Sequence, residues 1–253
     1  MKLVLLTALG VGGATLLGAI LGFMFKKISH KLGDIILSFA AGVMLAASII
    51  GLVLPSIEIG GGAKALPVAV IGIFLGALTV NLLDRLVPHL HKLSGIEPES
   101  HPEGGGKIDK ILLFVLAIAI HNFPEGIAAG VGFGTGDVSD GLIIAAGIAL
   151  QNIPEGMVII APMLSAGISH RRTFLIAAAT GLIEVIGTLL GYFAVTLSQA
   201  ILPFALAFAG GTMLYVISDE MIPETHSHGS ERGATYALLI GFCLMLAMDV
   251  LLG

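Results

Sequence analysis

His121-Asn122-Phe123-Pro124-Glu125-Gly126 has a close echo later in the chain, Gln151-Asn152-Ile153-Pro154-Glu155-Gly156, and each hexapeptide interrupts a long apolar run. Proline has no backbone N–H and clashes with the carbonyl of the fourth residue before it, so we expect Ile120 and Leu150 to lose their usual helical partners. A membrane tolerates such irregular backbone where it is buried in protein or lines a cavity. The two hexapeptides therefore predict a polar site inside a helical membrane protein.

The spacing within each hexapeptide places its polar side chains on one side of a helix, because residues three and four apart are neighbours there. These side chains are His121, Asn122 and Glu125 in the first hexapeptide, and Gln151, Asn152 and Glu155 in the second. The two motifs lie on consecutive apolar runs that must cross in opposite directions. A repeated motif on oppositely directed helices is what an inverted repeat produces.

The composition is that of a polytopic membrane protein. Of the 253 residues, 56% are hydrophobic and 11% are charged, whereas a soluble domain is about half apolar and about a quarter charged. Cys243 is the single cysteine, which excludes an internal disulfide and a thiolate-rich metal site. The formal charge of −5 comes without a basic patch, so no nucleic-acid partner is expected.

Eight apolar segments approach the roughly 20 residues that a helix needs to cross a bilayer. Within a single domain, 1–253, they lie at about 3–25, 33–54, 66–88, 109–132, 141–165, 172–196, 199–220 and 233–252. The first run is longer than the apolar part of a signal peptide and ends in Lys26 and Lys27, so it is interpreted as a retained span. The fold predicted is an all-α bundle of eight transmembrane helices.

Basic residues set the orientation, because cytoplasmic loops carry the excess of Lys and Arg. If both termini are extracytoplasmic, ten of the 12 Lys and Arg residues lie on the cytoplasmic side of the membrane, and only Lys2 and Lys64 lie outside. The polar loop at about 89–108 is then cytoplasmic. The sequence thus predicts a multi-pass protein of the cell (inner) membrane with both ends outside.

Three acids, Glu125, Glu155 and Glu184, fall near the middle of apolar runs. Each costs roughly 2.5–3.5 kcal/mol on insertion scales, and no Lys or Arg lies at that depth to neutralise it. A bound divalent cation offsets the charge; the alternative is that all three acids are protonated and hydrogen-bonded to neighbours. Imidazole, carboxylate and amide oxygen without thiolate favour Zn²⁺ or a neighbouring transition metal. Two ions bridged by Glu125 and Glu155 are feasible.

Smaller polar clusters lie near the ends of the apolar runs. The inner end of the seventh run carries Asp219, Glu220, Glu224, His226 and His228. At the outer side are Asp137, Asp140 and Asp249. The inner cluster is a candidate metal exit and the outer acids a candidate entrance, although solvated acidic helix ends are equally ordinary.

The paired hexapeptides and the central Glu184 resemble the ZIP family of divalent-metal transporters, most closely its bacterial GufA-like branch. This resemblance covers essentially the whole chain and implies a homodimer in the lipid bilayer. It also implies that the first, fourth, fifth and sixth spans move against the other four as in an elevator.

The resemblance further implies a binuclear centre. One site would be formed by His121, Glu125, Gln151 and Glu155, and its neighbour by Asn122, Glu125, Asn152, Glu155 and Glu184. Met44 matches a position that contributes a thioether in some members, and Asp219 and Glu220 match an acidic site at the cytoplasmic end. Many relatives have His in place of Gln151 and some have Asp in place of Asn152, which leaves the charge of the second site and the metal preference open.

The function expected is therefore transport of Zn²⁺, and also of Cd²⁺, Fe²⁺ or Mn²⁺, into the cytoplasm, without enzymatic activity. One alternative is an intramembrane metalloenzyme, but the sequence has no His-Glu-x-x-His helix for metal-assisted hydrolysis. The other is a metal-independent transporter of protons or organic cations that uses the three acids. Metal binding to the purified protein distinguishes that alternative.

Overall fold

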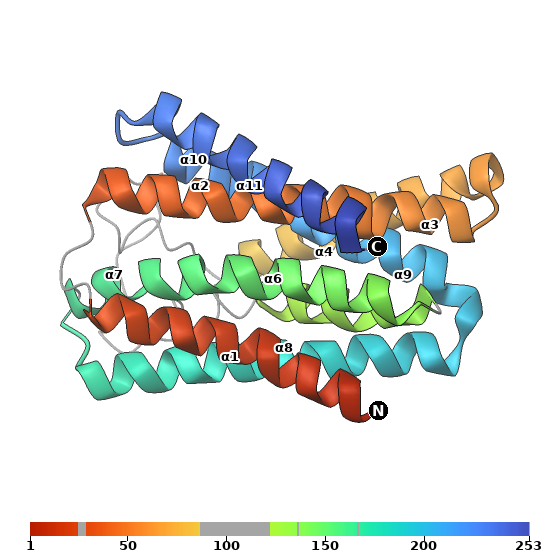
Figure 1. The fold of residues 1–253 in the computed structure, drawn as a ribbon, viewed down its shortest axis with the longest axis horizontal. Helices are drawn as coiled ribbons and strands as arrows, with labels where there is room; N and C mark the ends of the chain where they lie inside the picture. Colours follow the sequence, from red (N-terminus) through yellow and green to blue (C-terminus); the bar gives the residue numbers. More distant parts are fainter. Residues whose placement is uncertain (25–28, 87–121, 136, 166, 253) are drawn as a thin grey trace.

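The computed structural model describes residues 1–24, 29–86, 122–135, 137–165 and 167–252. Within these ranges the chain is helical and contains no strand, which confirms the all-α class. The helices run roughly along one axis of an elongated bundle, and both chain termini lie toward the same end (Figure 1). The expected cytoplasmic loop at about 89–108 and most of the expected span at 109–132 lie outside the described residues.

The longer elements are α1 (Lys2–Met24), α2 (His30–Ala46), α4 (Leu66–Leu86), α6 (Val138–Val158), α8 (His170–Leu197), α9 (Leu202–Val216) and α11 (Glu231–Leu252). The shorter helices are α3 (Leu54–Ile59), α7 (Ile160–Ser165) and α10 (Ile222–Thr225). Residues 122–132 are also helical. Single 3₁₀ turns lie at Gly62–Ala65, Phe133–Thr135 and Gln199–Ile201.

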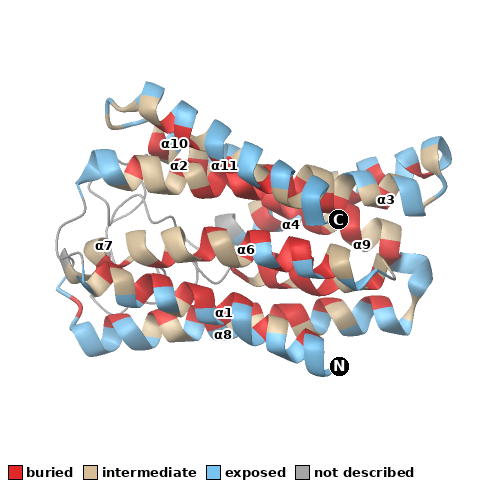
Figure 2. Cartoon of the chain, in the orientation of Figure 1, coloured by how far each residue is buried: buried red, intermediate tan, exposed pale blue. Residues whose placement is uncertain are grey.

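Seven stretches of the described residues are long and apolar enough to cross a membrane. They are Lys2–Met24, His30–Ile59, Gly62–Leu83, Val138–Val158, His170–Leu197, Gln199–Thr225 and Glu231–Leu252. The large apolar side chains on their outer faces are exposed in the isolated chain, as lipid-facing residues are, whereas the buried residues line the inside of the bundle (Figure 2). The number of spans and the side of the termini stay predictions.

Two of these stretches contain a wide turn just before a proline. The segments Ala47–Val53 and Ile217–Met221 are π-helical, and they precede Pro55 and Pro223. A proline cannot donate to the carbonyl four residues back, and an extra residue per turn is one way for a helix to continue past it. The second π-helical segment carries Asp219 and Glu220, so the proline also shapes the backbone around these acids.

Close backbone contacts at glycines bind α1 to its neighbours. A Cβ atom on Gly18 would collide with the backbone carbonyl of Ile153, and one on Gly12 would collide with that of Gly181. Gly156 is packed in the same way against the carbonyl of Thr15. Small residues allow membrane helices to approach this closely. They bring α1 into direct contact with the second hexapeptide in α6 and with the middle of α8.

The helices form two groups. The first group contains α1, residues 122–132, α6 and α8, and its members pack on one another through such glycines. In the second group α2 packs along α11 and α4 packs along α9. The two groups lie on opposite sides of the bundle (Figure 1), and α2 packs against α6 between them. The first group contains the spans that the family resemblance expects to move together, namely the first, fourth, fifth and sixth. Motion of this group relative to the second stays a prediction.

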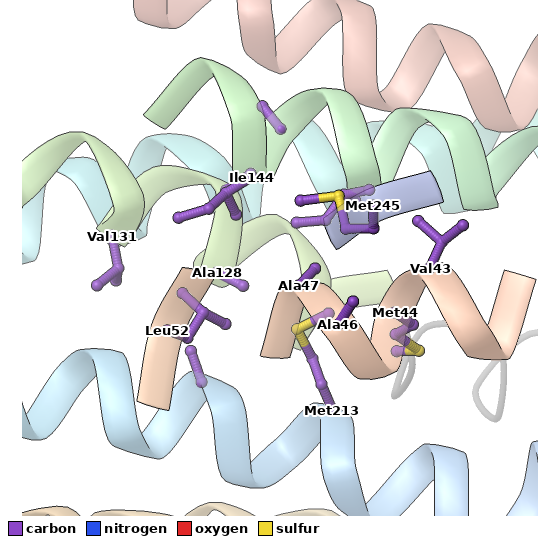
Figure 3. Packing of buried hydrophobic residues seen from close by; sticks show 14 of the residues in the cluster. Val43, Met44, Ala46, Ala47, Leu52, Ala128, Val131, Ile144, Met213 and Met245 are labelled. Atoms are coloured by element: carbon purple, nitrogen blue, oxygen red, sulfur yellow. The ribbon is translucent and has the colours of Figure 1, made fainter. Parts of the chain in front are cut away.

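A buried apolar cluster fills the junction between the groups (Figure 3). Its labelled members come from α2 and the π-helical segment after it, residues 122–132, α6, α9 and α11: Val43, Met44, Ala46, Ala47, Leu52, Ala128, Val131, Ile144, Met213 and Met245. Many of these side chains are small or are flexible methionines, which adapt to irregular gaps. Met44 is completely buried in this cluster.

Candidate metal centre

Buried acids and amides from adjacent helices meet in the first helix group. Residues 122–132 supply Asn122 and Glu125, α6 supplies Gln151 and Asn152, and α8 supplies Glu184. These five side chains are between 0% and 5% exposed. Glu155 of α6 is half-buried beside them. We call these six residues the polar centre.

Glu184 accepts hydrogen bonds from side chains of other helices. Its Oε1 accepts from Thr15 Oγ1 at 2.6 Å and from Nδ2 of Asn122, while its Oε2 accepts from Asn152 Nδ2 at 2.7 Å. The donors come from α1, residues 122–132 and α6, so the carboxylate ties together all four members of the first helix group. Hydrogen bonds to a charged group are the stronger kind, which suits a carboxylate that is completely buried.

Glu125 lies among like charges. Its carboxylate interacts electrostatically with those of Glu155 and Glu184, and the amide of Gln151 lies beside it. Among the described residues, the side chains that act on Glu125 and Glu184 are acids, amides and a hydroxyl, without a Lys or Arg. Several carboxylates this close together, away from water, favour a cation between them.

Several polar atoms of the centre have no hydrogen-bond partner. Within the described part of the chain, they are Glu125 Oε2, Gln151 Oε1, Gln151 Nε2 and Asn152 Oδ1. Leaving a buried polar atom unpaired costs about 1–3 kcal/mol, and more for a charged group, so native proteins rarely do it without a reason. A metal ion bound by the three oxygen atoms, or ordered water that also accepts from Gln151 Nε2, would remove that cost.

His121 lies outside the described residues, so its place in the centre stays a prediction. In the described ranges, no three His, Cys, Asp or Glu side chains are close enough to hold a metal ion together. A metal ion in the polar centre therefore draws on amide oxygens as well as on the acids, or on His121. The donor set of the described residues is carboxylate and amide oxygen.

The second hexapeptide lies within one continuous helix, so its residues keep the expected helical spacing. Helix α6 continues through Pro154 to Val158, and Gln151 and Asn152 are both completely buried. The proline still leaves the Leu150 carbonyl without its usual N–H partner. The proline that we expected to disturb the backbone therefore lies inside a helix that does not end at it.

Two participants in the centre were not predicted from the sequence. Thr15 is 2% exposed and donates to Glu184, and the backbone carbonyl of Val11 accepts from Asn152 Nδ2 at 3.3 Å. Both belong to α1, which carries no acid or histidine. The only sign in the sequence is a hydroxyl residue surrounded by the small residues that permit close packing.

The members of the candidate exit cluster after α9 have different surroundings, and the exit role of Asp219 and Glu220 stays a prediction. Asp219 is exposed and Glu220 half-buried in the π-helical segment, but the ring of His226 folds back onto the carbonyl of Ile222 at 2.9 Å. Histidine near a helix C-terminus commonly binds the last free carbonyls, and His226 does so here. His228 turns toward α2 instead, where its Nδ1 lies 3.1 Å from Asp34 Oδ1.

The candidate entrance acids have two different surroundings. Asp137 caps the N-terminus of α6, because its Oδ1 accepts a 2.8 Å hydrogen bond from the backbone N–H of Ser139. Asp140 and Asp249, from α6 and α11, lie close enough for their charges to interact. Asp137 is thus a helix cap, while Asp140 and Asp249 lie together, and the entrance role of the three acids stays a prediction.

A helical bundle with several apolar spans and a polar centre buried between them defines a multi-pass membrane protein. The model of the ZIP zinc transporter family matches residues 99–249. The chain is 43% identical to the zinc transporter GufA of Myxococcus xanthus, over 98% of both chains. It is 40% identical to the zinc transporter ZIPB of Bordetella bronchiseptica, over 95% of this chain and 78% of that protein. It is also 37% identical to the zinc transporter ZupT of Chlorobaculum parvum, over 95% of this chain and 94% of that protein.

The chain belongs to the ZIP zinc transporter family. The resemblance that the paired hexapeptides indicated is confirmed, and with it the prediction of a multi-pass membrane transporter rather than an enzyme.

Proposed function

We propose that this protein carries Zn²⁺ across the membrane into the cytoplasm and that the polar centre is where the ion binds during transport. The observation that carries the proposal is the set of unpaired buried atoms on Glu125, Gln151 and Asn152. These atoms are oxygen acceptors, apart from one amide nitrogen. They lie beside carboxylates on which, in the described part of the chain, no Lys or Arg acts. A divalent cation satisfies the acceptors and offsets the charge together.

The proposed ligands form two adjacent sites that share their acids. His121, Glu125, Gln151 and Glu155 hold one ion, and Asn122, Glu125, Asn152, Glu155 and Glu184 hold its neighbour. The hydrogen bonds from Asn122 and Asn152 to Glu184 support the second set, because they hold both amides against the carboxylate of Glu184. Glu125 and Glu155 bridge the two ions.

Binding of an ion changes the roles of the amides. Nδ2 of Asn122 and Nδ2 of Asn152 both donate to Glu184 in the structure, and Oδ1 of Asn152 is unpaired. A metal ion takes the amide oxygen, and its charge then replaces the hydrogen bonds that hold Glu184. Hydroxyl donation from Thr15 is compatible with both arrangements, since a carboxylate can accept it through one oxygen and bind a metal through the other.

Neutral Gln151 and Asn152 limit the negative charge of the centre. When ionised, Glu125, Glu155 and Glu184 together carry three negative charges, so one divalent ion leaves an excess of one negative charge. A second ion reverses the sign of that excess. We therefore propose that one ion binds more tightly than the second, and that Cd²⁺, Fe²⁺ or Mn²⁺ competes with Zn²⁺ because the ligand set is mixed.

The remaining parts of the proposal concern the whole assembly. A single transporter domain, 1–253, crosses the inner membrane as eight spans with both termini outside, and two copies form a homodimer.

Met44 contributes a thioether when the helix groups shift, since it lies in the apolar junction between them. Asp219 and Glu220 accept the ion on its way to the cytoplasm. The first helix group moves against the second to alternate access.

The test is uptake of Zn²⁺ into proteoliposomes that contain the purified protein, with Cd²⁺, Fe²⁺ or Mn²⁺ as competitor and with or without a proton gradient. We expect Zn²⁺ uptake that the Glu125→Gln variant loses, while the control Glu58→Gln, at an exposed position of α3, keeps it. Movement of protons or organic cations by a protein that binds no Zn²⁺ would contradict the proposal and favour a metal-independent transporter.

A further inference from the structure

An apolar groove lies between α2, α6 and α11, and α2 and α11 pack side by side (Figure 1). The groove has a volume of about 260 Å³ and is lined by Ile35, Ile36, Phe39, Pro154, Ala237 and Ile240. All six side chains are apolar, and all six residues belong to stretches that are apolar enough to cross a membrane. Ile240 is 62% exposed in the isolated chain, so the groove opens on the surface that faces lipid.

A second hollow lies at the start of the same two helices. Its volume is about 420 Å³, and its lining residues are Lys31, Gly229, Ser230, Glu231, Arg232 and Gly233. Lys31, Glu231 and Arg232 are exposed, so the hollow presents two cations and one acid. It lies at the end of the bundle that the basic residues predict to be cytoplasmic. We call it the basic hollow.

The groove and the basic hollow adjoin. Ile35 follows Lys31 by four residues in α2, and Ala237 follows Arg232 by five in α11, so the basic hollow lies about one helical turn nearer the membrane surface. A Cβ atom on Gly233 of the basic hollow would stand 3.8 Å from Cγ1 of Ile35 in the groove. A molecule with a charged head and an apolar tail can therefore fill both at once.

We propose that the basic hollow and the groove together bind an anionic phospholipid of the cytoplasmic leaflet. Its phosphate lies between Lys31 and Arg232, and one of its acyl chains lies in the groove. Arginine binds phosphate through paired hydrogen bonds and lysine binds it as a point charge, and basic residues beside a membrane span attract anionic lipids. At the depth of the groove the bilayer supplies hydrocarbon chains. Glu231 opposes a second negative charge, so a head group with a single charge fits best.

A lipid at this site contacts both helix groups. Pro154 belongs to α6 of the first group, whereas the other groove residues belong to α2 and α11 of the second. A bound molecule stabilises the arrangement to which it binds best, so the lipid favours the relative position of the groups seen in the structure. An effect of the lipid on transport rests on the proposed function, because it requires the groups to move; the binding itself does not.

The competing explanation is that Lys31 and Arg232 only orient the chain in the membrane and that any acyl chain fills the groove. The experiment titrates lipid into the full chain in detergent and counts bound lipid by native mass spectrometry. Phosphatidylglycerol is compared with phosphatidylcholine of the same acyl chains. We expect one phosphatidylglycerol per chain, bound more tightly than phosphatidylcholine. Lys31→Gln combined with Arg232→Gln should weaken phosphatidylglycerol binding by about 30-fold, from about 5-fold for each cation, and leave phosphatidylcholine binding unchanged.

Matched controls separate this site from a general attraction. Arg171→Gln combined with Arg172→Gln removes the same charge from the start of α8, which lines neither hollow, and should leave phosphatidylglycerol binding unchanged. Ala237→Leu extends into the groove and should weaken the binding of both lipids. Ala194→Leu makes the same change at an exposed position of α8 and should not. Inorganic phosphate should not displace the lipid, because it has no chain to fill the groove.

Three results would overturn the proposal. They are equal binding of the two lipids by the wild type, equal losses in the two charge variants, and displacement of phosphatidylglycerol by inorganic phosphate, which would assign the basic hollow to a free anion. Lys31 and Arg232 are exposed, so their variant is expected to fold and decides the proposal even where Ala237→Leu does not fold. Zn²⁺ uptake by the wild type in phosphatidylcholine vesicles decides the transport function separately.

Discussion

Thr15 of α1 donates a hydrogen bond of 2.6 Å to Oε1 of Glu184 in α8, and both side chains are buried. This bond connects a helix without any acid or histidine to the acid that also binds Asn122 and Asn152. A carboxylate that binds a metal is oriented by its outer partners, and loss of such a partner typically lowers metal affinity by about 10–100-fold. Thr15 is therefore placed to hold Glu184 in the geometry that the polar centre needs.

Replacing Thr15 by Val removes the hydroxyl at nearly constant volume. We expect this variant to weaken Zn²⁺ binding by about 10–100-fold, while Thr15→Ser, which keeps the donor, stays near the wild type. Thr196→Val is the control, because the hydroxyl of Thr196 is exposed and binds only the carbonyl of Tyr192 in its own helix. Equal Zn²⁺ affinities for Thr15→Val and Thr15→Ser, measured by calorimetry, would contradict this role.

The glycine contacts of α1 predict that Gly18→Ala and Gly10→Ala differ in stability. A Cβ atom on Gly18 meets the backbone of Ile153, whereas one on Gly10 of the same helix has no neighbour within 4 Å. Gly18→Ala should therefore lower stability by about 1–3 kcal/mol, as overpacking does. Gly10→Ala should leave it unchanged or raise it by up to about 1 kcal/mol, because Ala is the better helix former. Thermal unfolding in detergent measures both, and a stable Gly18→Ala variant would mean that α1 moves away from α6 easily.

Much of the polar centre could be predicted from the sequence because its geometry is local. Spacings of three and four residues determine that Gln151, Asn152 and Glu155 share a side of α6 whatever surrounds the helix. Glu184 was found because an acid in an apolar run is conspicuous. Thr15 was not found, since a lone threonine in an apolar run is ordinary and its partner lies 169 residues away.

The pairing of Asp34 with His228 was beyond prediction for the same reason. The two residues are 194 positions apart, and their contact depends on how α2 packs against α10 and on the left-handed turn at Gly229. The sequence placed His226 and His228 together because they are close in the chain. In the structure one ring caps α10 and the other reaches α2, so closeness in sequence was a poor guide to the geometry of this loop.

The topology predicted from the basic residues can be tested by labelling. In a Cys243→Ser background, an impermeant thiol reagent added to intact cells should react with Ala63→Cys and Val138→Cys, at one end of the bundle. It should not react with Ser227→Cys at the other end. All three positions are exposed, so lack of reaction reports the side of the membrane rather than burial. The reverse labelling would place the termini inside and would exchange the proposed entrance and exit.

The strongest effects on transport are expected from Glu125 and Glu155, the proposed bridging acids. Removing either one takes away a charge shared by both ions, whereas replacing another member of the centre affects one ion. Zn²⁺ uptake should therefore fall most in Glu125→Ala and Glu155→Ala, by more than about 100-fold. It should fall less in His121→Ala, and least in Glu184→Ala and Gln151→Ala. Initial rates of uptake into proteoliposomes give this order.

Folding has to be measured with these rates, because a buried acid opposes folding in the absence of metal. Insertion of one such group costs roughly 2.5–3.5 kcal/mol, so metal-free Glu125→Ala should melt at the wild-type temperature or above it. Zn²⁺ should then raise the melting temperature of the wild type by more than that of the variant, since a ligand stabilises the folded state in proportion to how tightly that state binds it. If folded Glu125→Ala and Glu155→Ala proteins both transport Zn²⁺ at the wild-type rate, the ion does not pass through the polar centre.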